Sequence, residues 1–276
     1  NEIAFITESV RNGHISGNGP FTLRAERLLT EITSAHRTLL TTNCTHALEL
    51  ASRVLRLQPG DEVIVPAFTF VSTAAAIALT GARPVFVDVI PGTLNLDPDL
   101  VEKSITPNTK AVFTVHYAGI GDRVDQLAEL CDQSGLTLVE DNAHGLGGTF
   151  QGRRLGTFGS MSTLSFHETK NITCGEGGAL TLNSPQFLES AEILREKGTN
   201  RARFLRGQVD KYTWVDVGSS WVASDILAAY LVGQLENFDS IQAKRHWIWN
   251  SYNSELTEWA AKQGVRLPQV PALAKH

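Results

Sequence analysis

The chain has 276 residues, of which 42% are hydrophobic and 19% charged, values that exclude a disordered or fibrous protein. Its formal net charge of −5 excludes a general attraction to nucleic acid or to an anionic membrane surface. The most apolar stretch, Ala74–Leu79, is too short to cross a bilayer. The chain begins without the basic and apolar regions of a signal peptide, so we expect a cytoplasmic protein.

Strand-length apolar runs alternate with helical patterns before about Pro185. The expected strands are Arg37–Thr41, Glu62–Val65, Arg83–Val87, Ala111–Val115, Thr137–Glu140, Ser162–Phe166 and Ala179–Leu182. The expected helices are Thr45–Leu57, Thr73–Leu79, Pro98–Ile105 (capped by Asp97), Val124–Ser134, Phe187–Glu196, Ser224–Phe238 and Ser240–Lys262. This alternation predicts an α/β fold with a mostly parallel seven-stranded sheet flanked by helices. A basic, strand-poor stretch from Lys197 to Val217 interrupts the helical pattern that follows.

The segment Ser165–Gly178 carries the clearest sign of chemistry. A short apolar run delivers Lys170 into a polar loop that ends in three glycines among four residues, where close backbone approach is allowed. Upstream, an apolar strand ends on the carboxylate of Asp141. A lysine and a strand-end acid are the two groups that a pyridoxal phosphate (PLP) site needs. The alternative for Lys170 is an ordinary surface lysine. The alternative for Asp141 is a residue that only caps a turn, and this is as favoured as a role in binding a ligand.

Other candidate residues follow the strands. Thr41–Ala47 follows one strand and opens a helix, which suits a phosphate, but an ordinary N-cap is the favoured interpretation of this stretch alone. His144 lies three residues after Asp141 and can face the same cavity. Phe70 follows another strand and can stack on a flat ring, but a core aromatic is the favoured interpretation. The basic stretch Arg195–Lys211 is either a solvated charge run or a diphosphate-binding loop.

Motifs of competing chemistries are absent from the sequence. The chain has no Walker lysine, no G-x-G-x-x-G fingerprint, no G-x-S-x-G elbow and no HExxH helix. Its cysteines, Cys44, Cys131 and Cys174, are widely spaced and odd in number. That pattern favours a reducing compartment and predicts neither a disulfide nor a metal site.

Taken together, these segments resemble the DegT/DnrJ/EryC1/StrS sugar aminotransferase family, PLP enzymes with the aspartate-aminotransferase fold (fold type I). The likeness covers nearly the whole chain, from the stretch Asn12–Thr22 to the last helix. It implies a large PLP-binding domain over 1–235 and the start of a small C-terminal domain, apparently truncated, over 236–276. It also implies a homodimer with shared active sites.

By the same matching, Lys170 binds the cofactor covalently and acts as the catalytic base. Asp141 pairs with the pyridine nitrogen, His144 lies beside the ring oxygen, and Phe70 stacks on the ring. Cys44, Thr45 and Ser165 hold the phosphate, and Ser220 occupies the position that reaches the partner subunit's phosphate.

A finer likeness lies in the stretch 196–220. It implies amino transfer from L-glutamate to C4 of dTDP-4-keto-6-deoxyglucose, giving dTDP-4-amino-4,6-dideoxygalactose for bacterial surface glycans such as lipopolysaccharide and enterobacterial common antigen. Arg201, Lys211 and Tyr212 are then the expected substrate-binding residues. The alternatives are a transaminase for another keto-sugar nucleotide and a non-catalytic homologue that serves as a dimerising or PLP-binding scaffold.

Overall fold

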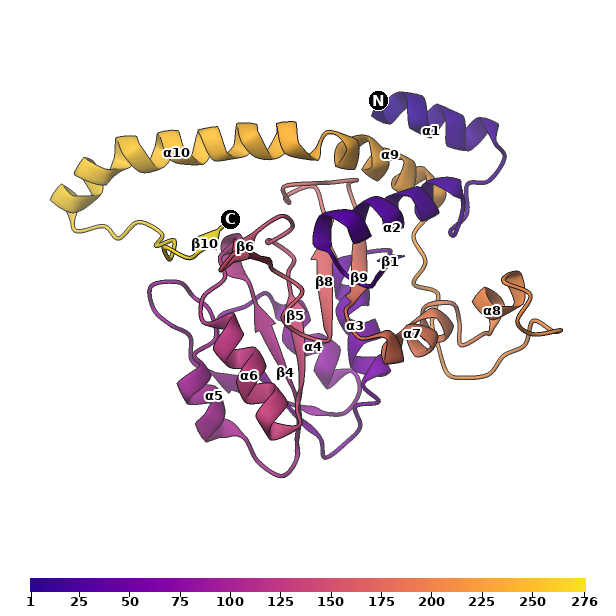
Figure 1. Ribbon diagram of the computed structural model, residues 1–276, viewed down its shortest axis with the longest axis horizontal. Coiled ribbons are helices and arrows are strands. Elements are labelled where there is room, and N and C mark those ends of the chain that lie inside the picture. Colours follow the sequence, from indigo (N-terminus) through magenta and orange to yellow (C-terminus); the bar gives the residue numbers. More distant parts are fainter.

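The computed structural model describes all residues from 1 to 276 (Figure 1). Its strands are β1 (Arg37–Thr41), β2 (Glu62–Pro66), β3 (Arg83–Val87), β4 (Thr109–Val115), β5 (Thr137–Asp141), β6 (Thr149–Phe150), β7 (Arg153–Arg154), β8 (Met161–Ser165), β9 (Gly178–Leu182) and β10 (Ala274–Lys275). Its α-helices are α1 (Glu2–Arg11), α2 (Pro20–Thr33), α3 (Cys44–Val54), α4 (Val71–Ala78), α5 (Pro98–Ser104), α6 (Val124–Ser134), α7 (Leu188–Arg195), α8 (Arg201–Leu205), α9 (Asp225–Glu236) and α10 (Phe238–Gln263). Two 3₁₀ turns cover Tyr117–Gly119 and Pro185–Phe187.

The central sheet has seven strands in the order β1-β9-β8-β5-β4-β2-β3. Only β9 runs against its neighbours β1 and β8; the other pairs are parallel. The expected seven-stranded, mostly parallel sheet is therefore confirmed. A second, three-stranded sheet, β10-β6-β7, was not expected from the sequence. Its strands have two residues each, too few to show an alternating pattern.

Alternation along the strands sorts the apolar side chains into layers. On one face of the sheet, strand side chains such as Val139 and Phe113 pack against α3, α4 and α7. On the other face, strand side chains such as Leu138 and Val112 pack against α5 and α6. At β8, β9 and β1, this other face of the sheet is covered by α2 and α9 instead. The sheet is thus buried on both sides, as a parallel sheet requires.

Because β1, β2, β4, β5 and β8 all point the same way, their carboxyl ends meet at one edge of the sheet. Open α/β sheets bind their ligands at this edge. At or directly after these strand ends lie the start of α3, the turn before α4, Tyr117, Asp141 and Lys170. The fold therefore brings together residues from five distant parts of the chain.

Helix ends follow ordinary capping chemistry. The Asp97 carboxylate accepts from the backbone N–H of Asp99, as expected for the start of α5. Less obviously, α2 is capped by Asp225, a residue from the first turn of α9. Its buried carboxylate accepts from the backbone N–H groups of Phe21 and Thr22 at 3.3 and 2.7 Å. Asp225 thereby ties the two helices that cover the edge of the sheet.

Most of the basic stretch belongs to a long excursion that we call the arm, residues 197–219, which lies beyond α7 (Figure 1). Its ends are joined by the backbone hydrogen bond from Lys197 N–H to the Ser219 carbonyl (2.8 Å). Its apolar side chains are largely exposed: Phe204, Leu205, Tyr212, Trp214, Val215 and Val217. The arm therefore offers an apolar surface that the chain itself does not cover.

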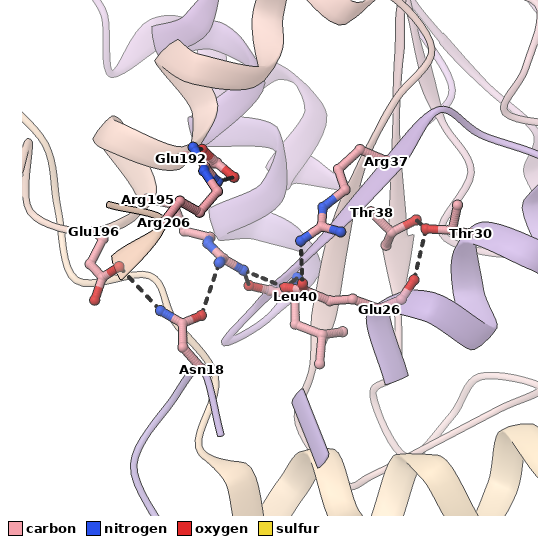
Figure 2. A network of polar contacts seen from close by, with 10 residues as sticks. All are labelled: Asn18, Glu26, Thr30, Arg37, Thr38, Leu40, Glu192, Arg195, Glu196 and Arg206. Carbon is pink, nitrogen blue, oxygen red and sulfur yellow. Dashed lines mark hydrogen bonds and ion pairs between the residues drawn. The ribbon is translucent and has the colours of Figure 1, made fainter. Parts of the chain in front are cut away.

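A buried polar network fixes the base of the arm (Figure 2). Arg195, at the end of α7, donates to the Glu26 carboxylate at 2.8 Å and to the Leu40 carbonyl at 2.9 Å. Its other terminal nitrogen donates to the Asn18 side chain, which in turn donates to Glu196. The network links α2, β1, α7 and the loop before α2.

At the other end of the fold, α10 runs away from the sheet with a single buried residue, Ala260 (Figure 1). None of the helices combines the length and apolarity needed to cross a membrane.

Candidate active site

The edge of the sheet holds a cavity of about 260 Å³. Seven of the expected cofactor residues line it: Cys44, Thr45, Phe70, Asp141, His144, Ser165 and Lys170. The four remaining expected residues, Ser220, Arg201, Lys211 and Tyr212, do not line it within the single chain. All four lie on the arm or directly after it.

Asp141 is the last residue of β5 and is only 5% exposed. Its Oδ2 accepts from the Thr73 hydroxyl at 2.7 Å and its Oδ1 from the backbone N–H of Ala143 at 3.2 Å. Burial raises the pKa of Asp141, and the two hydrogen bonds and nearby Lys170 oppose that rise. The carboxylate has no cationic partner at ion-pair distance, so it can accept one from a ligand.

Lys170 lies in the loop Phe166–Gly177, which joins β8 to β9. Backbone hydrogen bonds continue the strand pairing into this loop, from Phe166 to Gly177 and from Glu168 to Gly175. Gly175 adopts a φ of +85°, which favours glycine in the turn. Burial lowers the pKa of Lys170, while Cys44 and Asp141 act in the opposite sense. A lowered pKa supplies the neutral amine that bonding to a carbonyl carbon requires.

The start of α3 provides the anion site. Asn43 caps the helix by accepting from the His46 N–H, and the first N–H groups of the helix have no intrahelical partner. The hydroxyls of Thr45 and Ser72 lie 2.7 Å apart at the cavity wall. Gly178 lets β9 approach this helix start, because a Cβ there would lie 2.3 Å from the carbonyl carbon of Asn43.

His144 is held by its neighbours. Its Nδ1 accepts from the backbone N–H of Ala118 at 3.1 Å, and its ring stacks edge-on against Tyr117. Burial, with a smaller effect of Lys170, lowers the pKa of His144 to about 4. The ring is therefore neutral at pH 7, with its proton on Nε2.

Phe70 corrects the interpretation favoured from the sequence. It is 71% exposed and lines the cavity, so it is not a core aromatic. Its position at the N-cap of α4, directly after the turn that follows β2, keeps its ring at the open side of the cavity.

Several cavity residues were not singled out from the sequence. Thr69, Ser72, Tyr117, His167 and Glu176 line the wall, and Thr73 lies behind it and donates to Asp141. The hydroxyls of the turn after β2 were a usable signal, because that turn also carries Phe70. Nothing in the sequence indicated that Thr73 would meet a carboxylate 68 positions away.

The basic stretch is mostly paired within the chain. Arg195, Arg201, Arg203 and Arg206 form ion pairs with Glu26, Glu196, Glu189 and Glu192, respectively. Lys197 and Lys211 form no ion pair and are exposed. Of the two cations expected to bind substrate, Arg201 is thus already engaged and Lys211 is available.

The residues present fit pyridoxal phosphate. The buried carboxylate of Asp141 lacks a cation and suits a protonated pyridine nitrogen. The helix start with its hydroxyls suits a phosphate, and Lys170 lies in the same cavity as both. The bound cofactor supplies an electron-accepting ring that stabilises negative charge on the substrate carbon.

Comparison with known proteins agrees with this fit. The family model described as "DegT/DnrJ/EryC1/StrS aminotransferase family" matches residues 1–275. The spore coat polysaccharide biosynthesis protein SpsC of Bacillus subtilis is 34% identical over 260 residues, covering 93% of this chain and 67% of that protein.

Solved structures of aminotransferases are also similar to this chain in sequence and in fold. The PLP-form of the putative sugar aminotransferase Spr1654 from Streptococcus pneumoniae is 31% identical with a TM-score of 0.88, covering 99% of this chain and 72% of that one. The aminotransferase TlmJ from Streptoalloteichus hindustanus is 32% identical with a TM-score of 0.90, covering 99% and 73%. The chain belongs to the DegT/DnrJ/EryC1/StrS aminotransferase family, whose members are PLP-dependent sugar aminotransferases.

Proposed function

We propose that this chain transfers an amino group from L-glutamate to C4 of a nucleotide-linked 4-keto-6-deoxyhexose. The substrate is dTDP-4-keto-6-deoxyglucose and the product dTDP-4-amino-4,6-dideoxygalactose, used in the cytoplasm for bacterial surface glycans. One observation carries the proposal: Lys170 and Asp141 face one cavity beside the start of α3. That arrangement suits amino transfer, and neither the buried Asp141 nor the partly buried Lys170 has an ion-pair partner within the chain.

Lys170 has two tasks in this reaction. Its amine, whose pKa burial lowers, would bond to the cofactor's aldehyde carbon and hold the cofactor in place. With the cofactor bound, the Lys170 Nζ would act as general base and acid and move the proton of the substrate carbon. Asp141 stays charged beside the pyridine nitrogen, and Phe70 restrains the ring so that the reacting atoms stay aligned.

The arm is the proposed contact for the nucleotide. Lys211 carries an unpaired, exposed charge, and Tyr212 beside it is 51% exposed. A charge-assisted contact to a diphosphate is worth about 1.5–3 kcal/mol, so losing Lys211 costs roughly tenfold or more in acceptor affinity. Arg201 contributes only if a ligand draws it away from Glu196.

Completion of the site requires a second copy of the chain. Phe70 is exposed on the open side of the cavity, and Ser220 is exposed after the arm, outside its own cavity. In a homodimer, the arm of one protomer covers the cavity of its partner. Ser220 then reaches the partner's phosphate.

Two alternatives are separated by simple measurements. A non-catalytic scaffold does not change the bound cofactor's absorbance when glutamate is added, whereas a transaminase bleaches the long-wavelength band. A transaminase for another keto-sugar bleaches with glutamate but yields no product from dTDP-4-keto-6-deoxyglucose. Mass-spectrometric product analysis over a panel of dTDP- and UDP-linked keto-sugars therefore tests the proposal, and a product from none of them overturns it.

A further inference from the structure

Two titratable side chains at the mouth of the cavity have no part in holding the cofactor. His167 and Glu176 lie near the two ends of the loop Phe166–Gly177, and both line the cavity wall. Their side chains are 40% and 65% exposed, respectively, in contrast to the buried Asp141. They therefore face the route by which a substrate reaches Lys170.

The hydrogen bonds of the loop orient the His167 ring. Its Nδ1 accepts from the backbone N–H of Thr169 at 3.3 Å and lies 3.0 Å from the Thr169 hydroxyl. The neutral ring therefore carries its proton on Nε2. This nitrogen lies 3.7 Å from Oε1 of Glu176.

That separation is too long for a direct hydrogen bond. The Nε2–H donor and the carboxylate acceptor consequently both keep capacity for a ligand. One oxygen placed between them can accept from His167 and donate to Glu176 at ordinary hydrogen-bond distances. A hydroxyl group meets both requirements, whereas a carboxylate lacks the proton and is repelled by Glu176.

We infer that His167 and Glu176 form a hydroxyl-binding subsite that recognises the hydroxyl next to the reacting carbonyl of the amino acceptor. The inference rests on the proposed function and narrows its substrate class to acceptors that carry this hydroxyl. Glutamate, the proposed donor, has no hydroxyl, so the subsite acts on only one of the two half-reactions.

The kinetic test compares acceptors with and without the hydroxyl. The variants are His167→Phe, which keeps a ring without its donor, and Glu176→Gln, which removes the charge. Glu168→Gln is the matched control, since Glu168 is exposed in the same loop but does not line the cavity. Stopped-flow absorbance follows each half-reaction, with dTDP-4-keto-6-deoxyglucose and its 3-deoxy analogue as acceptors.

We expect His167→Phe and Glu176→Gln to lose roughly tenfold or more in kcat/KM for the hydroxylated acceptor. With the 3-deoxy acceptor, both variants should match the wild type, neither variant should lose rate in the glutamate half-reaction, and Glu168→Gln should match the wild type throughout. Equal losses with both acceptors, or no loss with either, overturn the inference.

A binding measurement keeps the test independent of turnover. Calorimetric titration of the apo-protein with dTDP-glucose and its 3-deoxy analogue should show the same selective loss, roughly tenfold, in the two variants. If the wild type aminates neither keto-sugar, the proposed function fails, and the calorimetry still decides about the subsite. Equal affinity of the wild type and the two variants for dTDP-glucose contradicts the hydroxyl-binding subsite.

Discussion

Asp141 is the side chain whose burial most needs a ligand to account for it. Two neutral donors, the Thr73 hydroxyl and the Ala143 N–H, satisfy part of its hydrogen-bonding capacity, and no cation lies at ion-pair distance. A carboxylate buried in this way destabilises the protein without a ligand and binds a cationic ring strongly.

Asp141→Asn should therefore separate activity from stability. Removing the charge costs about a hundredfold to a thousandfold in turnover, as for other preorganised electrostatic partners. Because burial raises the pKa of Asp141 above its ordinary 3.8, ionisation costs folding free energy as pH rises through the raised pKa. At pH 7 the apo variant should unfold at no lower temperature than the wild type. Near-normal turnover in this variant means that Asp141 only caps a turn.

The lowered pKa of Lys170 predicts how the rate of PLP capture depends on pH. Burial lowers the pKa of Lys170 below its ordinary 10.5, so the rate of PLP capture by the apo-protein should rise with pH to a midpoint below that value. Asp141 raises the pKa of Lys170, hence Asp141→Asn should move the midpoint to lower pH. Absorbance measures the rate, and an upward shift in the variant contradicts this arrangement of charges.

The presence of Lys170 and Asp141 at the cavity could be predicted from the sequence, because each residue stands in a recognisable local pattern. Lys170 stands between an apolar strand and a glycine cluster, and Asp141 ends a strand. Thr73 and Glu176 could not be assigned in this way. Their roles depend on which turns meet at the edge of the sheet, and strand order is not written in any local segment.

At the level of helices and strands, periodicity located all seven strands of the central sheet to within two residues at either end. Helices α1 and α2 were not predicted, and α3 ends at Val54, three residues before the expected Leu57. Arg56 adopts a positive φ, which ends the helix despite the apolar pattern continuing to Leu57. Within the arm, α8 has only five residues, so it lacks a readable period.

The buried network at the base of the arm should contribute strongly to stability. Arg195→Met removes the shorter of the two cationic contacts of the buried Glu26 carboxylate and leaves only Arg37 at 3.5 Å, which costs about 3 kcal/mol of unfolding free energy. Arg203→Met is the matched control, because Arg203 pairs with Glu189 at the surface, where a pair is worth about 1 kcal/mol or less. Urea denaturation measures both variants, and equal losses would show that the network does not anchor the arm.

Assembly of the whole molecule follows from the surface of the arm. Light scattering should give about twice the 30.1 kDa mass of the chain. Trp214 is 73% exposed on the arm, so Trp214→Ser should weaken association, whereas Trp247→Ser, 68% exposed on α10, should leave the arm contact intact. A PLP-loaded, active monomer refutes the shared site.

The proposed mechanism depends on covalent attachment of the cofactor to Lys170, which peptide mapping can detect. The protein is incubated with PLP, reduced with borohydride, digested and analysed by mass spectrometry. We predict the added cofactor mass on the peptide that contains Lys170 and none on the same peptide of Lys170→Ala. Cofactor mass on another lysine, or on none, contradicts it.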